Sequence, residues 1–448
     1  MNNLVCPLDF RYGREKIREV FSESTKLSLL LKVEAALAKA HSQLGNIPSE
    51  AASEIEKKAC LKWVKLERVK QIEQETKHDI GAVVKALTEV CEGDAKRWVH
   101  LGATSYDMVD SVNALQLAKA CEIINSGLLE LNKLILGLAR EHKSTMMVGR
   151  THGQHALPIT FGLKMSCFAS EIDRQIRRVK QSKEEISVGK MLGAVGTGAG
   201  LGEHALEIQK IVMDELGLRA EVGATQIVGR DRYIHFLSTC ANIASTLEKI
   251  AQEIRNLQRT EIGEVAEGFA KKQMGSSAMP QKKNPIRCEQ TCGLARVIRS
   301  NLLPAWENAL QWHERDLCNS SSERFILAHT CILLDWIVYQ MISVFEGIQV
   351  YPERMRENLE KSLGLPLAES VMTKLINRGV DREEAYRLVQ RLSAEAVSQK
   401  TAFSGILKSS KAVIRHLTLK EIDEATDPKN YLGKSEELVE LIIKNCRK

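Results

Sequence analysis

The placement of proline is the sequence feature that most constrains the fold of this chain. The chain has nine prolines, and none lies between Pro158 and Pro280. Because a proline inside a helix removes a hydrogen bond and clashes with the preceding turn, this stretch permits long helices. Within it, apolar residues recur at alternating steps of four and three at Ile243, Leu247, Ile250, Ile254 and Leu257. This spacing predicts one face of a packed helix that continues less regularly through Ile262 and Val265.

Two further apolar stripes have helical spacing. One consists of Ile124, Leu128, Leu131, Ile135 and Leu138, and the other opens with Leu294, Val297 and Ile298. Strand-like alternation is scarce, and aromatic residues make up only 5% of the chain. We therefore predict an all-α fold with a long central helical bundle. Helices of this length cannot bury all their apolar faces in one slim monomer, so we expect the bundle to be shared between subunits.

A chain of 448 residues is too long for one small core. We expect an N-terminal helical domain over residues 1–105, a central long-helix bundle over 106–351 and a C-terminal helical domain over 352–448. The middle block carries the long periodic stripes, and the last block, which opens at Pro352, has the pattern of shorter amphipathic helices.

Composition narrows the class of protein. Hydrophobic residues make up 44% and charged residues 27%, which is typical of a soluble globular protein. The net charge of +6 forms no basic tail or stripe, so we expect no nucleic-acid partner. No apolar run approaches the ~18 residues of a membrane span, and the N-terminus lacks a signal-peptide pattern. The eleven cysteines are scattered without a CxxC pair, which favours a reducing cytosol over a disulfide framework.

Two glycine-rich segments have different characters. Residues 189–202 (GKMLGAVGTGAGLG) fit neither the GxGxxG spacing nor the P-loop, because Leu201 stands where a glycine is needed and Met191 follows Lys190. A loop between helices remains, and whether it contacts a ligand is left open. Residues 275–285 (GSSAMPQKKNP) combine glycine and serine with Lys282 and Asn284, a cation and an amide that can hold a carboxylate. We expect this second loop to be functional.

Several short polar segments interrupt the helical patterns. In residues 149–155, His152 and His155 are three residues apart, but no carboxylate has matching spacing, so an acid–base role suits a histidine there better than metal binding. Cys288 and Cys292 lack a nearby His/Cys pair, and we expect no zinc site. The other polar segments are residues 75–79, 100–107, 312–316 and 320–324.

Taken together, these segments resemble the fumarase/aspartase superfamily. GSSAMPQKKNP is similar to the superfamily signature, and THGQHA, TKHD, HLGATSYD, TQIVGRDR and WHERDLCNSSSER are similar to segments of its adenylosuccinate lyase branch. The resemblance runs from Arg11 and Tyr12 to Arg324. It implies a three-domain all-α fold, a cytoplasmic homotetramer whose active sites combine segments of several subunits, and no metal or organic cofactor. It also implies β-elimination of fumarate from adenylosuccinate to give AMP, and from the succinylaminoimidazole-carboxamide ribotide of the same purine pathway.

One residue departs from this pattern. Adenylosuccinate lyases commonly have His where this loop has Gln281, and MPQKKNP is closer to argininosuccinate lyases. However, the Arg-Ser-Arg-Asn-Asp run expected of that family is absent where ATSYD stands. Argininosuccinate lyase, a cycloisomerase and a helical scaffold without activity are therefore the alternatives, and fumarate release distinguishes them.

The resemblance also implies roles for individual residues. Ser276 would be the base, His152 the acid that protonates the departing nitrogen, and Glu289 the partner that keeps a histidine charged. The substrate-binding residues would be Lys282, Asn284, Thr104 and Ser105 for the succinyl carboxylates, His78, Asp79 and Gln226 near the leaving nitrogen, and Arg11, Tyr12, Arg315, Ser320 and Arg324 for the phosphate.

Overall fold

The computed structural model describes residues 4–268 and 278–446. The chain divides into two compact units, each built from three segments. Unit 1 comprises Met1–Leu128, Gln175–Leu247 and Cys292–Tyr339, and unit 2 comprises Leu129–Arg174, Glu248–Thr291 and Gln340–Lys448. Each of the long helices lies partly in unit 1 and partly in unit 2. These helices are α7 (Ser105–Glu141), α8 (Phe161–Ile186), α10 (Asp231–Leu257), α11 (Ile286–Ser300) and α13 (Cys318–Gly347). The predicted division by sequence into 1–105, 106–351 and 352–448 stays a prediction.

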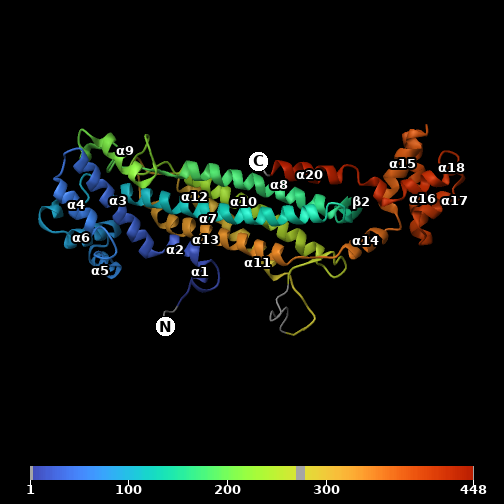
Figure 1. Ribbon diagram of the computed structural model, residues 1–448, viewed down its shortest axis with the longest axis horizontal. Helices are drawn as coiled ribbons and strands as arrows, with labels where there is room; N and C mark the ends of the chain where they lie inside the picture. The colour runs from blue at the N-terminus through green and yellow to red at the C-terminus, as the bar shows by residue number, and fades with distance from the viewer. Residues whose placement is uncertain (1–3, 269–277, 447–448) are drawn as a thin grey trace. The chain divides into compact units, whose positions relative to one another are not determined.

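Shorter helices complete unit 1. They are α1 (Pro7–Phe10), α2 (Glu15–Val20), α3 (Glu23–Gln43), α4 (Ser49–Lys58), α5 (Leu66–Thr76), α6 (Asp79–Val90), α9 (Ala205–Leu216) and α12 (Leu302–Glu307), with the paired strands β3 (Val188–Gly189) and β4 (Arg219–Ala220). Figure 1 shows α3, α4, α5 and α6 gathered in the blue part of the chain, with the green α9 beside α3. Their apolar faces form one core, which also contains Met108 and Val112 from the start of α7.

Unit 2 holds the remaining strands and α-helices. They are the hairpin of β1 (Met146–Thr151) and β2 (Gln154–Thr160), the strand pair β5 (Val265–Ala266) and β6 (Gln349–Val350), and the helices α14 (Pro352–Glu360), α15 (Ala368–Asn377), α16 (Arg382–Gln399), α17 (Phe403–Ser409), α18 (Lys411–Ile414), α19 (Leu419–Ala425) and α20 (Ser435–Asn445). Helices α15, α16, α17 and α19 share a small core that includes Val371, Phe403 and Leu407. These helices are orange and red in Figure 1.

The prediction of an all-α fold is confirmed, because the strands of the described chain are short and most residues are helical. The stripe from Ile243 to Leu257 lies on α10, where each member is at most 2% exposed. The expected continuation to Val265 is wrong. The helix ends at Leu257, whose carbonyl accepts from the Glu264 N–H at 2.9 Å, and Val265 belongs to β5.

The stripes on α7 and α11 differ in outcome. On α7, Ile124, Leu128, Leu131 and Ile135 are buried, as predicted, whereas Leu138, the last member of the stripe, is only half-buried. On α11, Val297 is 46% exposed, because the buried face runs through Cys288, Cys292, Ala295 and Ile298. The prediction that Val297 lies on the buried face of α11 was therefore wrong, and the next residue, Ile298, lies on that face instead.

Helix α13 qualifies the expectation that no apolar run approaches a membrane span. Among the helices of the described chain, it is the one that is long and apolar enough to cross a membrane by length and composition alone. However, 72% of its most apolar window is buried, which is usual for the core helix of a globular protein, so this is weak evidence for a membrane. Its Asp335 is fully buried and paired with Arg14.

Candidate active site

Unit 1 contains a cleft of about 600 Å³ between α3, α5, α6 and the first turns of α7 and α13. Six of the predicted site residues line it, and they are His78, Asp79, Ser105, Arg315, Ser320 and Arg324. Part of the lining is apolar, with Leu27, Val69 and Ile80 among its residues. The cleft therefore offers several hydrogen-bond donors and cations beside apolar side chains, as small-molecule sites commonly do.

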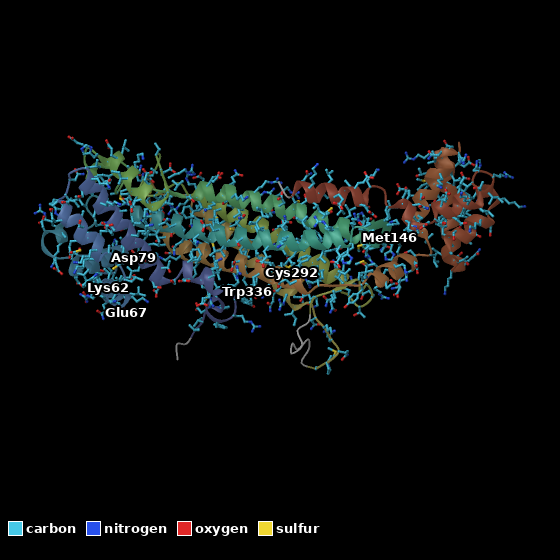
Figure 2. All side chains as sticks on the ribbon, in the orientation of Figure 1. Lys62, Glu67, Asp79, Met146, Cys292 and Trp336 are labelled. Carbon is cyan, nitrogen blue, oxygen red and sulfur yellow. The ribbon has the colours of Figure 1, made fainter. Side chains whose placement is uncertain are left out.

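The start of α6 fixes two of these side chains. Nδ1 of His78 accepts from the Gly81 N–H at 2.9 Å and so caps the helix. Because Nδ1 is an acceptor, the proton of the neutral imidazole lies on Nε2. Asp79, labelled in Figure 2, accepts from Nη2 of Arg324 at 2.6 Å. Burial raises the pKa of Asp79, but the Ile80 N–H and Arg324 outweigh burial and leave that pKa below its usual value.

Arg315 is held from two sides. Its guanidinium carbon lies 3.6 Å from the centroid of the Tyr106 ring, and its Nη1 donates to Oε1 of Gln226 at 2.8 Å. Among the residues that the structure describes, its Nε and Nη2 are buried and have no hydrogen-bond partner. Because buried donors are nearly always satisfied, these two nitrogens indicate that an acceptor binds here, and their fork suits an oxyanion.

A buried ion-pair network supports this side of the cleft. Arg230, 4% exposed, makes two hydrogen bonds to Asp110 at 2.9 and 3.0 Å and two to Glu323 at 2.8 and 3.1 Å. It also donates to the carbonyl of Val228 at 2.9 Å. Three parts of the chain are joined by this network: α7, the segment just before α10, and α13. The network thereby fixes α13, which carries Ser320 and Arg324.

A second buried group organises the start of α7. Asp107 is fully buried and accepts from Nζ of Lys190, which is also fully buried, and from the N–H groups of Leu192 at 3.1 Å, Gly193 at 3.0 Å and Thr104 at 2.8 Å. The glycine-rich segment 189–202 therefore packs against the Thr104–Ser105 turn. Gly102 has a φ of +71°, and a Cβ there would collide with the carbonyl of Gly200, so glycine is required at this approach.

In unit 2, His152 lies at the tip of the β1–β2 hairpin. Thr151 pairs with Gln154, so His152 and Gly153 form a two-residue turn, and their φ values of 53° and 74° are those of a type I′ turn. His152 is exposed. Arg150, two residues earlier, anchors the hairpin through two hydrogen bonds to the buried Glu264, at 2.7 and 3.0 Å. The rest of the hairpin is thereby held while the histidine is presented to solvent.

Residues 278–285, the described part of the loop GSSAMPQKKNP, precede α11. Glu267, 5% exposed, accepts from the N–H groups of Arg287 at 3.2 Å and Cys288 at 2.7 Å and so fixes the start of this helix. Glu289 lies in the first turn and is exposed. Lys282 is exposed and Asn284 half-buried on the segment that precedes the helix. Ser276, the predicted base, lies outside the described residues, as does the first part of its loop.

Comparisons with known proteins identify the family. Residues 9–300 match the Lyase family, and residues 364–442 match the family described as Adenylosuccinate lyase C-terminus. The chain is 49% identical to the adenylosuccinate lyase of Pyrococcus horikoshii, over 98% of this chain and 97% of that one. It is 46% identical to the adenylosuccinate lyase of Methanocaldococcus jannaschii, over 99% of this chain and 96% of that one. The chain belongs to the adenylosuccinate lyase family.

Solved structures agree with this family. The chain matches a fumarate lyase from Mesorhizobium sp. BNC1 with a TM-score of 0.90 at 32% identity, covering 96% of this chain and 98% of that one. It matches the 3-carboxy-cis,cis-muconate lactonizing enzyme from Pseudomonas putida with a TM-score of 0.89 at 30% identity, covering 98% of each. The adenylosuccinate lyase family and the fumarase/aspartase-like fold predicted from the sequence are both confirmed.

Four predicted residues of unit 1 do not line the cleft. Arg11 is exposed just after α1, and the ring of Tyr12 packs edge-on against Trp336, with centroids 6.3 Å apart. Thr104 lies in the turn before Ser105, and both ends of the Gln226 amide are bonded, to Arg315 and to the carbonyl of Ala194. In this lyase, Gln226 therefore supports Arg315.

Lys26 and Tyr106 are cleft residues that the sequence analysis did not single out as site residues. Lys26 on α3 lines it, and burial, together with the charge of Arg324, lowers the pKa of this lysine. Tyr106, 5% exposed, contacts Arg315. No spacing rule singles out Lys26, because a lysine among apolar residues of a helix usually extends to solvent. Tyr106 lies inside HLGATSYD, which was the available signal. No group of three or more His, Cys, Asp or Glu suited to a metal occurs in the described chain.

Proposed function

We propose that this adenylosuccinate lyase releases fumarate from adenylosuccinate to give AMP, and acts in the same way on the succinylaminoimidazole-carboxamide ribotide. The match to curated adenylosuccinate lyases over 98% of the chain carries the proposal. The cleft supports it, because Arg315, Ser320 and Arg324 supply the cations and the hydroxyl that a nucleotide phosphate needs. Both substrates share the succinylamino group and the ribose phosphate, so one site can serve both.

The reaction removes a proton from a carbon beside a carboxylate and expels a nitrogen. This carbon acid is weak, because the new charge develops next to an existing one. Catalysis therefore needs a base, an acid for the nitrogen and fixed positive groups where the charge gathers. We assign the base to Ser276 and the acid to His152, with Glu289 paired to a histidine. Lys282 and Asn284 hold the carboxylate whose charge grows.

The remaining assignments concern substrate binding. The Nε2–H of His78 faces substrate near the leaving nitrogen, since Nδ1 is already used to cap α6. Ser105 binds a succinyl carboxylate with Thr104, in the turn that Asp107 fixes. We also assign Arg11 and Tyr12 to phosphate binding. The elimination requires no metal or organic cofactor, so a chelator should leave turnover unchanged.

We further propose a homo-oligomer, with four subunits the expected number, in which each active site combines segments of several chains. Unit 1 exposes a set of large apolar side chains that a monomer would leave in water, and they are Leu303, Trp306, Leu310, Trp312, Leu317 and Phe325. Such patches usually mark protein interfaces. Mixing inactive Ser276→Ala subunits with inactive Arg315→Met subunits should restore part of the activity. Mixed oligomers without any recovered activity would contradict a shared site.

The first experiment is fumarate formation by the purified protein, followed by ultraviolet absorbance. Adenylosuccinate, the succinylaminoimidazole-carboxamide ribotide and argininosuccinate are given in parallel. We expect turnover of the first two and none of the third. Turnover of argininosuccinate alone would mean that Gln281 was the decisive signal, and it would overturn the proposed substrate. The cytosolic location remains part of this proposal.

A further inference from the structure

Tyr106, in the segment HLGATSYD, contacts Arg315 and lies close to Ser320. It is the second residue of α7 and is buried, with 5% of its surface exposed. Its ring lies 3.6 Å from the guanidinium carbon of Arg315, and its hydroxyl lies close to Ser320. Two groups that we assign to the phosphate therefore lie beside different parts of one side chain.

The ring and the hydroxyl have separate physical effects. A guanidinium that lies over an aromatic face tends to be held parallel to that ring, so the edge that bears its free N–H groups points in a defined direction. Gln226 fixes one nitrogen of Arg315, and the ring fixes the plane, so that Nε and Nη2 remain for a ligand. The phenolic hydroxyl lies close to Ser320, and both residues line the cleft, so the hydroxyl can limit the positions open to the Ser320 side chain. Pre-ordering these donors removes an entropic cost that binding would otherwise incur.

Tyr106 is itself fixed by its surroundings. The guanidinium of Arg230 lies 5.7 Å from the Tyr106 ring centroid, and Arg230 is locked between Asp110 and Glu323. The next residue, Asp107, is the buried acceptor of Lys190. The ring therefore has little freedom to move when a ligand binds, and it can transmit this rigidity to Arg315.

We propose that Tyr106 is a positioning residue for the phosphate of the substrate, and that it makes the site selective for nucleoside monophosphates over uncharged nucleosides. This inference rests on the proposed function, because it takes Arg315 and Ser320 as phosphate-binding groups. It concerns binding, so it can be tested without the chemical step.

The test compares the binding of AMP and of adenosine to the intact protein by calorimetry. Tyr106→Leu removes the ring and the hydroxyl, and it should weaken AMP binding by roughly ten- to a hundredfold. Tyr106→Phe removes only the hydroxyl that lies close to Ser320, and it should weaken AMP binding by roughly three- to tenfold. Adenosine binding should change little in both variants, because adenosine has no phosphate.

Tyr233 provides the matched control. It is 3% exposed, and its ring also faces Arg230, at 4.6 Å. Tyr233→Phe and Tyr233→Leu should not change the ratio of AMP to adenosine affinity. A general loosening of the fold would lower both affinities together, in either pair of variants.

A double variant covers the case in which Tyr106→Leu does not fold. If Tyr106 acts through Ser320, Tyr106→Phe and Ser320→Ala should cost less together than the sum of their separate effects on AMP binding. Additive effects, or equal losses of AMP and adenosine binding, would overturn the inference. A wild-type protein that binds AMP but releases no fumarate from adenylosuccinate would instead overturn the proposed function and leave the role of Tyr106 to be decided by the binding ratio.

Discussion

Replacing His152 by Asn should separate the two roles of the hairpin tip. The structure places His152 at φ 53° and Gly153 at φ 74°, the two central positions of a type I′ turn. Asn-Gly is the most favoured pair for this turn, because Asn tolerates a positive φ better than other residues with a Cβ. The variant should therefore keep the hairpin, and its free energy of unfolding should change by less than about 1 kcal/mol.

Catalysis should respond differently. Asn cannot give a proton to the departing nitrogen, and loss of a general acid lowers a rate by roughly 10²–10⁴-fold. The assay is fumarate release from adenylosuccinate, with circular dichroism and denaturant unfolding on the same preparation. The control is His155→Asn in the neighbouring strand, where Nδ1 of His155 lies 2.6 Å from Oγ of Ser362. Turnover by His152→Asn within about tenfold of wild type would refute the role of His152 as the acid.

Three further predictions test the supporting structure and the base. Lys190→Met leaves the buried Asp107 without its cation, so it should lower the free energy of unfolding by roughly 3–5 kcal/mol. The control is Lys39→Met in the exposed Lys39–Glu215 pair, which should cause no measurable change in denaturant unfolding. Equal losses in the two variants would contradict the role of Lys190. Although burial lowers the pKa of His100, its bond to Glu34 raises that pKa above the usual value. The difference in unfolding free energy between wild type and His100→Asn should therefore be largest below about pH 6.5 and should fall as pH rises through the higher folded-state pKa of His100. Denaturant unfolding at several pH values measures this difference, and a difference that grows with pH would refute the prediction. Ser276→Ala should fold and assemble normally but release fumarate at least about 10²-fold more slowly, and near-normal turnover would exclude Ser276 as the base.

The sequence predicted the helices well where an apolar stripe was long. The stripe on α10 has five members at regular spacing, and all of them are buried. The shorter α11 stripe was too brief to set the phase, and Val297 was assigned to the wrong face. A few apolar residues fit neighbouring helical phases equally well, so only packing against other helices selects one.

The β1–β2 hairpin was missed for a physical reason. Each strand has at most seven residues and its buried residues do not alternate cleanly, and the register of the pair shifts between Val148 and Arg150. The signal that was available is His152–Gly153, a pair ending in glycine between two short β-compatible segments. The polar character of residues 149–155 was therefore recognised without the strand pairing that produces it.

The charged residues of the polar segments show what sequence alone could not supply. Asp107 and Glu323 come from two of those segments and Arg230 comes from TQIVGRDR, and each is buried in an ion pair with a residue far away in the chain. Read alone, a charged residue in a polar segment is usually solvated. Removing such a residue from water is costly, and the cost is offset only when its partner and backbone donors are all in place. These networks hold the turns that carry Ser105, Arg315 and Ser320, so the segments with site residues also contain the buried charges that position them.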